Sequence, residues 1–408
     1  MKFDTDIVIA GAGLNGCAMA LALASVGIAS VIVDPQLAKD QQSPAFDGRA
    51  YSLAHGSVRM LQVLGVWNSI ATKAQPILDI KVTDGKAGQG AGPQFLHFDH
   101  RELEEGPMGQ MIEDRYLRRA MLDLITNTPL IRYIEGTSVT GHRPQNAHVE
   151  VTLSDDTKLL ARLLVGCDGR RSNTARDAGL VRRGWDYDQS ALVCAVEHEL
   201  PHNGTAHQFF TPSGPLAILP LAGRRSSIVW SETAQRAAEI AQMNDTDFLT
   251  ALRPVFGDFL GEIALAGARF SYPLTLSLVD DFVGARVALV GDAAHGIHPL
   301  AGQGLNLGLK DVASLSEVLA MALRRGEDIG RMDVLARYQT WRRFDTQMMA
   351  AATDGINRLF SNDNLFLRGL RDMGLGSVNA MPNLRRGFMR HAAGLSGDLP
   401  KLMLGQGI

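Results

Sequence analysis

The chain has 408 residues, of which 46% are hydrophobic and 20% are charged, and its net charge is −3. This length suggests roughly one to three domains, and the composition excludes a disordered, collagenous or coiled-coil chain. The balanced charge offers nucleic acid no basic surface to bind. Three scattered cysteines cannot form a disulfide framework, and no export signal precedes the first apolar run, so we expect a cytoplasmic protein.

The first predicted elements are a buried strand at residues 6–10, a glycine-rich turn and a helix at residues 17–26. The turn contains the G-x-G-x-x-G pattern of dinucleotide-binding folds, in the order Gly11, Ala12, Gly13, Leu14, Asn15 and Gly16. The first glycine permits a tight turn, the second lets a pyrophosphate approach the backbone, and the third lets helix and strand pack closely. The N–H groups and the dipole at the helix N-terminus then favour phosphate.

A second strand at residues 31–33 ends at Asp34, where a carboxylate can accept hydrogen bonds from an adenosine ribose. An acid here argues against a 2′-phosphate, but the pattern alone does not separate FAD from NAD. The lack of charge between residues 7 and 33 would also suit a membrane span, yet the glycines divide this stretch into strand, helix and strand. We therefore expect a dinucleotide site at this end of the chain.

A helix is expected next, at residues 57–64, and a flexible hairpin or loop at the glycine-rich residues 85–93. The glycine-rich segment follows no strong strand and opens no helix, so it lacks the setting of a phosphate cradle. No second dinucleotide fold is recognisable in the sequence. A nicotinamide cofactor would therefore have to bind in a surface groove.

Two later strands are also expected to end in turns that carry an acid. The strand at residues 163–166 leads into the sharp turn Asp168-Gly169, and a helix starts shortly after it. The plain alternative is an ordinary junction between a strand and a turn.

The strand at residues 286–290 leads to Gly291 and Asp292. Ligands of open α/β sheets bind at the carboxyl ends of the strands, so Asp292 should reach the sugar-like part of a cofactor. Glycines 302 and 304 then free the backbone for close approach, and a long helix is expected to about residue 325. The N-terminus of such a helix would stabilise the negative charge on a reduced flavin ring.

Together the three motifs resemble those of the flavoprotein aromatic monooxygenases, the single-component group similar to para-hydroxybenzoate hydroxylase. The resemblance covers the chain to about residue 345, and its most specific part is Gly-Asp-Ala-Ala-His followed by Pro and Gly-Gln-Gly-Leu-Asn. More closely, the chain looks like the ubiquinone-biosynthesis hydroxylases. The segments that carry this second resemblance are residues 47–53, 214–221, 359–363 and 379–382.

The resemblance implies a set of FAD-binding residues. At the adenosine end they are the glycine loop at residues 11–16, Asp34 at the ribose and Arg115 at the phosphate and ribose. Asp292 would lie at the ribitol. At the ring, the backbone of Gly302, Gln303, Gly304, Leu305 and Asn306 would line the isoalloxazine.

Three further residues complete this implied set. Pro299 would lie beside the flavin ring, and Arg49 near the flavin, although without the resemblance Arg49 is better read as a surface residue before the helix at 57–64. Asp168 has been linked in this family to both FAD and NAD(P)H, so its role stays open. No motif identifies a catalytic base.

The fold class that follows is α/β, with a Rossmann-type FAD-binding domain of the glutathione-reductase-like kind, a mixed-sheet substrate domain and a helical C-terminal tail. We assign residues 1–70, 100–180 and 270–345 to the first, 71–99 and 181–269 to the second, and 346–408 to the third. Strands are expected at residues 191–197, 208–211, 216–221 and 226–230, in a sheet that roofs the active site.

The activity implied by the resemblance is hydroxylation of a phenol, in which NAD(P)H reduces FAD and oxygen adds to the flavin as a hydroperoxide that attacks the aromatic carbon. In the closer resemblance the substrate is prenylated and belongs to ubiquinone biosynthesis. The alternatives are a flavin oxidase or hydroxylase of a soluble aromatic compound, a non-catalytic FAD-binding partner of a biosynthetic complex, and a plain NAD dehydrogenase.

Two surface and loop features complete the expectations. Residues 366–395 hold five basic residues against one acidic, so the tail would suit anionic lipid or a multi-enzyme complex, a solvated helical face being the plainer alternative. His295 and His298 have the i, i+3 spacing of paired metal ligands, but they lie in a loop without a third ligand nearby, and we expect no metal.

Overall fold

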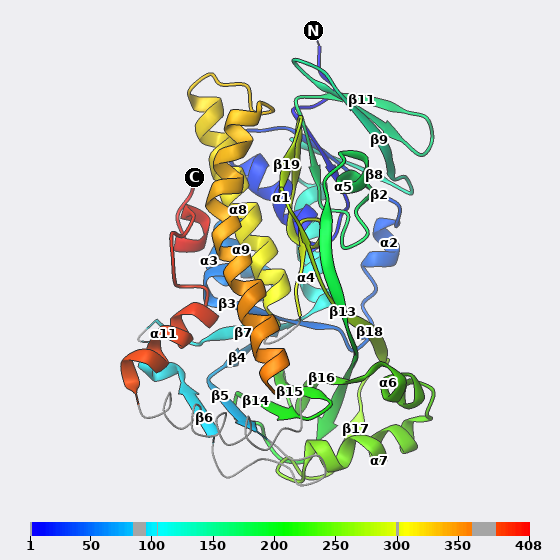
Figure 1. Cartoon of the computed structure of the whole chain (residues 1–408), viewed down its shortest axis with the longest axis vertical. Helices are drawn as coiled ribbons and strands as arrows, with labels where there is room; N and C mark the ends of the chain where they lie inside the picture. The colour runs from blue at the N-terminus through cyan, green and yellow to red at the C-terminus, as the bar shows by residue number, and fades with distance from the viewer. Residues whose placement is uncertain (1, 85–94, 104, 299–301, 361–380) are drawn as a thin grey trace.

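The computed structural model describes residues 2–84, 95–103, 105–298, 302–360 and 381–408. Pro299, the glycine-rich residues 85–93, and residues 366–380 of the basic segment 366–395 therefore lie outside the described residues. Figure 1 shows an elongated molecule, with the N-terminus and β9–β11 at one end and α6, α7 and the broad sheet at the other.

The first sheet has six strands in the order β19-β20-β12-β1-β2-β8. They are β1 (Ile7–Ala10), β2 (Ser30–Asp34), β8 (Ile131–Glu135), β12 (Leu163–Gly166), β19 (Val283–Gly284) and β20 (Val287–Leu289). All pairs are parallel except β19 with β20, and every residue of β1 and β12 is buried. Runs of apolar residues without alternation suit strands that are covered on both faces. The buried strands expected from the sequence are confirmed.

Long helices cover this sheet. They are α1 (Leu14–Ser25), α4 (Asp114–Thr126), α8 (Gln303–Arg324) and α9 (Met332–Phe360). Figure 1 shows α8 and α9 side by side along one edge of the molecule, and α1 packs against both α8 and α4. The first helix begins at Leu14 and not at Cys17, because Gly13 is the extended residue before the helix and Gly16 lies within its first turn.

The second sheet is mixed, as expected, and has nine strands. They are β5 (Asp79–Asp84), β6 (Phe95–Asp99), β13 (Arg182–His198), β14 (Thr205–Thr211), β15 (Gly214–Leu221), β16 (Arg225–Thr233), β17 (Ile263–Leu265), β18 (Phe270–Val279) and β21 (His295–Gly296). Its one described parallel pair is β14 with β5, and its other described pairs are antiparallel. The four strands expected in this region lie within β13, β14, β15 and β16.

Helices α6 (Ala234–Ala241) and α7 (Asp245–Phe256) build a separate core against this sheet, around Trp230 and Phe248. The remaining small sheets are β3 (Ala50–Ala54), β4 (Gln75–Ile77) and β7 (Gly109–Glu113), and β9 (Val139–Pro144), β10 (Val149–Leu153) and β11 (Lys158–Ala161). The remaining described α-helices are α2 (Ala38–Gln41), α3 (His55–Val63), α5 (Asn173–Asp177) and α11 (Pro382–Ala392).

Two element boundaries differ from the domain division that we expect from the sequence. Strand β18 belongs to the nine-stranded sheet, because it pairs with β13 from Val193↔Phe270 to Arg182↔Val279, although residues 270–279 were assigned to the FAD-binding domain. Helix α9 runs across the expected boundary at 345/346 without interruption. Within the expected C-terminal segment, residues 346–360 continue α9 and residues 382–392 form α11.

Candidate cofactor and substrate site

Of the three glycines in the loop after β1, only Gly13 has free space beside its backbone. Gly11 has φ +98°, and a Cβ there would lie 2.6 Å from the carbonyl oxygen of Cys167. A Cβ on Gly16 would overlap the carbonyl oxygen of Gly11, whereas a Cβ on Gly13 would meet nothing within 4 Å. Gly11 and Gly16 are thus needed by the protein itself, and Gly13 borders open space at the N-terminus of α1.

Asp34 lies against this loop, at the carboxyl end of β2. Its Oδ2 accepts a hydrogen bond from the backbone N–H of Ala12 at 2.6 Å, and its Oδ1 accepts from the N–H of Gln36 at 2.8 Å. The fold therefore brings the acid and the glycine fingerprint together, as the sequence pattern predicts.

The side chain of Asn15 connects this loop to the third motif. A Cβ on either Gly291 or Gly308 would overlap the Asn15 amide, so both glycines make room for it. Its Oδ1 is buried and has no hydrogen-bond partner in the described part of the chain. Leu14, in contrast, is a buried core residue.

The N-terminus of α8 is the second glycine-lined site. Gly302 precedes the helix in the left-handed conformation, with φ +64°, and a Cβ on Gly304 would meet nothing within 4 Å. Gln303 is the first helical residue, and Leu305 packs partly buried against the main core.

Asn306 ties this helix N-terminus to β3 and α3. Its Oδ1 accepts from the N–H of Ala54 and from the hydroxyl of Ser57, each at 2.8 Å, and its Nδ2 donates to the carbonyls of Ser52 and Gly302. Every hydrogen-bonding position of the amide is filled by protein. The side chain of Asn306 therefore shapes the site, and only its backbone is left to face a ligand.

These features fit FAD. Two helix N-termini, those of α1 and α8, follow glycines and lack a side-chain cap among the described residues. Free N–H groups at such termini attract phosphate and developing negative charge. The residues at 11–16 with Asp34 would hold the adenosine and pyrophosphate, and the backbone at 302–306 would hold the flavin ring. Bound FAD would supply hydride acceptance and oxygen activation.

The two other acidic positions of the motifs differ from each other. Asp168 is occupied by its own turn, since it accepts from the hydroxyl of Ser172 at 2.5 Å and from the N–H and hydroxyl of Thr174 at 3.0 Å. This arrangement fixes the start of α5. Asp292 is 40% exposed at its side chain and pairs with Arg170 at 3.1 Å, so it remains accessible.

The two predicted arginines lie on the side of β3 and β7. Arg49 pairs with Asp47 at 2.7 Å and with Asp114 at 3.5 Å, and 42% of its side chain is exposed. Arg115 donates to Glu113 at 2.7 Å and to the carbonyl of Pro44 at 2.6 Å. Both have protein partners, and their contact with a cofactor stays a prediction.

A buried charge network lies behind the third motif and was not expected from the sequence. Asp311 accepts from the backbone N–H of Gly291 at 3.0 Å, bonds His295 Nε2 at 2.5 Å and accepts from Arg342 Nε at 2.8 Å. Arg342 also donates to Asp345, which pairs with Lys310. The side chains of His295, Asp311 and Arg342 are fully buried. The feature of the sequence that could have revealed this network is the pair Lys310 and Asp311, two charged residues at adjacent positions inside the largely apolar helix 303–324.

The electrostatics of the network favour the ionised acid. Burial alone would raise the pKa of Asp311, but the charges and hydrogen bonds of His295 and Arg342 outweigh it and hold that pKa below its ordinary value. The network therefore anchors the Gly291–His295 turn to α8 and α9. His295 is engaged with Asp311 and is not paired with His298.

His298 has a different environment. It is 1% exposed, and neither of its ring nitrogens has a hydrogen-bond partner among the described residues. Burial, with the charge of Arg170 adding to it, lowers the pKa of His298 to about 4. The ring of Tyr187 contacts it edge-to-face, with centroids 5.3 Å apart.

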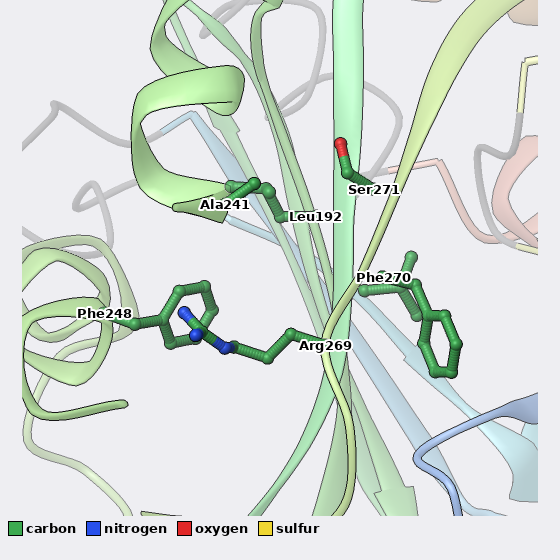
Figure 2. Close-up of a pocket in the computed structure, with 7 residues that line it drawn as sticks. Leu192, Ala241, Phe248, Arg269, Phe270 and Ser271 are labelled. Carbon is green, nitrogen blue, oxygen red and sulfur yellow. The ribbon is translucent and has the colours of Figure 1, made fainter. Parts of the chain in front are cut away.

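Two cavities in the described part of the chain are small. One of about 60 Å³ lies beside the α8 N-terminus and is lined by Ser57, Gln303, Asn306 and residues of α9 and α11. Another, of about 40 Å³, lies between β13, β18 and α6, and Figure 2 shows Arg269 crossing it towards the ring of Phe248. This second cavity has room for little more than water and is lined by none of the three motifs.

Comparison with known proteins agrees with the site. Residues 4–352 match the family described as FAD binding domain. The chain is 43% identical to ubiquinone hydroxylase UbiL of Rhodospirillum rubrum, over 98% of this chain and 92% of that protein. It is 32% identical to 3-demethoxyubiquinol 3-hydroxylase of Escherichia coli, over 96% of this chain and 99% of that protein.

A solved structure shows the same fold. The p-nitrophenol 4-monooxygenase PnpA of Pseudomonas putida DLL-E4 superposes with a TM-score of 0.79 and covers 97% of this chain and 99% of its own, at 18% identity. The fold expected from the resemblance, a FAD-binding domain with a mixed-sheet domain and a helical C-terminal segment, is confirmed.

Proposed function

The chain belongs to the FAD binding domain family of flavin-dependent hydroxylases, and on this premise we propose that it hydroxylates the aromatic ring of a prenylated phenol in ubiquinone biosynthesis. FAD is the cofactor, NAD(P)H the reductant and oxygen the co-substrate. The observation that carries the proposal is that two helix N-termini lack a side-chain cap among the described residues and each has a glycine with free space beside it, Gly13 at α1 and Gly304 at α8. The relatives of this chain are named for the same chemistry.

The protein's own contribution is positioning and the exclusion of water. The loop at 11–16 and Asp34 would hold the nucleotide, and the network at Asp311 would keep the turn at Gly291 in place. The N-terminus of α8 would stabilise negative charge on the flavin ring. The nine-stranded sheet would cover the ring side and receive the substrate.

The direct test is product formation under labelled oxygen. Protein loaded with FAD is given NADPH or NADH, a phenol with a short prenyl chain and oxygen gas enriched in a heavy isotope. We expect a hydroxylated phenol that carries one labelled oxygen atom and reductant consumption that depends on the phenol. The matched control is Gly13→Ala, in which the new methyl group projects into the open space at the N-terminus of α1 and should weaken FAD binding without disturbing the loop.

The alternatives give other results. Hydroxylation of a plain phenol but not of its prenylated form would point to a soluble aromatic substrate. Reductant consumption that yields only hydrogen peroxide would point to an oxidase. Bound FAD without any turnover would favour a structural partner in a biosynthetic complex.

We also propose that the protein binds the surface of an anionic membrane, where a prenylated substrate resides. An apolar stripe on the outer face of α9 supports this, formed at helical spacing by Phe344, Met348, Ala352, Gly355 and Leu359. Phe344 is 70% exposed and Met348 52% exposed. Arg343 and Arg358 flank the stripe but pair with Asp281 at 3.8 Å and with Asp354 at 3.0 Å, so the apolar side chains carry this proposal.

In the described part of the basic tail, two arginines of α11 are paired with acids of the body. In α11, Arg385 pairs with Glu102 at 2.8 Å and Arg390 with Glu105 at 3.1 Å. In the described part of the chain, no helix is long and apolar enough to cross a membrane. The stripe on α9 is the feature to test, because Phe344 and Met348 are exposed there.

Flotation with vesicles of phosphatidylethanolamine and phosphatidylglycerol tests membrane contact. We expect the full chain to float and the double variant Phe344→Ser, Met348→Ser to remain with the soluble fraction. Met332→Ser is the matched control, because Met332 is 54% exposed at the other end of the same helix. Equal flotation of all three proteins would remove this part of the proposal.

A further inference from the structure

The starting point is the pair of unmatched nitrogens on His298. The residue is 1% exposed, and neither nitrogen bonds any described residue. A buried polar atom without a partner costs free energy, and native proteins rarely leave two on one ring. Such a group indicates a hydrogen-bonding partner that is not part of the protein.

The surroundings hold the imidazole in place without using its nitrogens. Tyr187 packs against it with centroids 5.3 Å apart and ring planes at 77°. The hydroxyl of Tyr187 donates to Asp354 of α9 at 3.0 Å, so this tyrosine is itself fixed. Nearby on the same two elements, Asn357 donates to Gln189 at 3.1 Å. These contacts join β13 to α9 around His298.

The neighbourhood combines two charged groups, Arg170 and Asp354, with an apolar cluster. A cluster of Leu276 from β18, Ile297 next to His298, Leu307 from α8 and Ala350 from α9 is buried here, with Tyr187, Leu278 and Met349 packed against it. Leu307 directly follows the backbone segment 302–306, so this cluster connects the segment proposed to line the flavin ring with the nine-stranded sheet. His298 is next to Ile297 of the cluster in the chain and contacts Tyr187, which packs against it.

The chemistry of the site matches a phenol. With its pKa lowered to about 4, the His298 ring is neutral near neutral pH and offers one donor and one acceptor nitrogen. A phenolic hydroxyl also offers one donor and one acceptor, and its aromatic ring suits apolar walls. A hydrogen bond accepted from the hydroxyl would raise electron density on the aromatic ring, which is the nucleophile in hydroxylation.

We infer that His298 binds the phenolic hydroxyl of the substrate by a direct hydrogen bond, with Leu276, Ile297 and Leu307 against the ring. This inference rests on the proposed function. It assigns His298 as a substrate-contacting residue, with Tyr187 and Asp354 as the residues that position it.

The test compares a phenol with its methyl ether. The oxidised, FAD-loaded protein is titrated with 2-prenylphenol and with 2-prenylanisole, and the change in flavin absorbance gives each dissociation constant. The ether keeps the ring and the prenyl chain but has lost the hydroxyl donor. We expect the wild-type protein to bind the phenol about tenfold more tightly, the scale of one good hydrogen bond in a buried site.

Three variants locate the effect. His298→Leu should bring the ratio of the two dissociation constants to about one, and His298→Gln, which keeps a donor and an acceptor, should retain part of the preference. The matched control is His207→Leu, since His207 is a partly buried histidine packed on Phe259, on a strand separated from β13 by two others. That variant should keep the tenfold ratio.

The outcomes separate the inference from the proposed function. A tenfold preference that survives in His298→Leu overturns the inference alone. Loss of FAD from both His298 variants, with folding retained by circular dichroism, overturns it in favour of a flavin contact. Wild-type protein that binds FAD but neither ligand contradicts the phenolic substrate, and the inference falls with it.

Discussion

The buried polar groups on the two sides of α8 are built in opposite ways. Asp311, behind the Gly291 turn, meets a backbone N–H, an imidazole and a guanidinium. His298, facing the nine-stranded sheet, meets none of these in the described part of the chain. One nitrogen each of His295 and Arg342 also lacks a partner in the described part of the chain, but both side chains are held through other nitrogens, whereas His298 is held through neither. We therefore assign the Asp311 network to the fold and, as inferred above, His298 to a ligand. Removing partners should therefore have different consequences on the two sides.

The largest effect is expected when Asp311 loses its guanidinium. Arg342→Met should lower the free energy of unfolding by about 3–5 kcal/mol, because it leaves an uncompensated buried charge. The neighbouring Arg343→Met is the matched control, since its side chain is 49% exposed and should change stability by less than about 0.5 kcal/mol. Urea unfolding curves of both variants measure this. Equal, small effects would mean that the network does not anchor the fold.

The next effect concerns the amide of Asn306. Asn306→Ala removes four hydrogen bonds and leaves the buried N–H of Ala54 without an acceptor, so we expect a loss of about 2–3 kcal/mol. Asn68→Ala, at an exposed asparagine, should leave stability within about 0.5 kcal/mol of wild type. Thermal unfolding of each apoprotein measures the two changes in stability. An Asn306→Ala variant as stable as the wild type would show that water replaces these hydrogen bonds.

The third effect is on the pH dependence of stability. His298 has its pKa lowered from 6.5 to about 4 in the folded chain, so the unfolded chain binds the extra proton between these values. The contribution of His298 to the free energy of unfolding is therefore fully present above pH 6.5 and is lost as the pH falls towards about 4, because the unfolded chain then binds a proton that the folded chain does not. Arg170 strengthens the shift, whereas Asp354 opposes it.

Replacing His298 should therefore flatten this part of the curve. In His298→Leu we expect the slope of unfolding free energy against pH to decrease by up to about 1.4 kcal/mol per pH unit, the value for one proton. His207, whose pKa is also lowered to about 4, keeps its contribution in both proteins. Unfolding at a series of pH values gives the slopes, and parallel curves would contradict a buried neutral His298.

The smallest effect on the fold, with a clear effect on the cofactor, is expected at Gly13. Gly13→Ala places a methyl group in open space, so the apoprotein should keep its stability within about 0.5 kcal/mol. FAD affinity should fall at least about tenfold, because that space is where the pyrophosphate would approach. Gly387→Ala, where a Cβ also meets nothing within 4 Å, should leave FAD binding unchanged. Flavin fluorescence titrations compare the two.

The sequence predicted the cofactor side well, because its signals are local. The strand, glycine loop and helix at residues 6–26 and the acid at Asp34 lie close in sequence, and Asp34 indeed bonds the N–H of Ala12. Composition and turn residues likewise placed the strands of β13 to β16. The helix start was predicted three residues late, since the third glycine was taken to precede the helix that contains it.

The other side depends on contacts between distant segments, which no local pattern encodes. Tyr187 meets His298 and Asp354 across more than a hundred residues of chain. Arg342 reaches Asp311 between two helices, and β18 joins β13 through long antiparallel pairing. His298 was noticed only for its spacing from His295, and its burial without partners emerged from the fold.

The most direct measurement of this contrast is the nitrogen NMR spectrum of the histidine rings in the FAD-loaded protein, with and without 2-prenylphenol. Comparison with His298→Gln and with a His295 variant assigns the two signals. We expect the His298 acceptor nitrogen to shift on ligand binding and the His295 signals, held by Asp311, to stay in place. If the His298 signals stay unchanged while the phenol binds, the assignment of His298 as the residue that bonds the phenolic hydroxyl is contradicted.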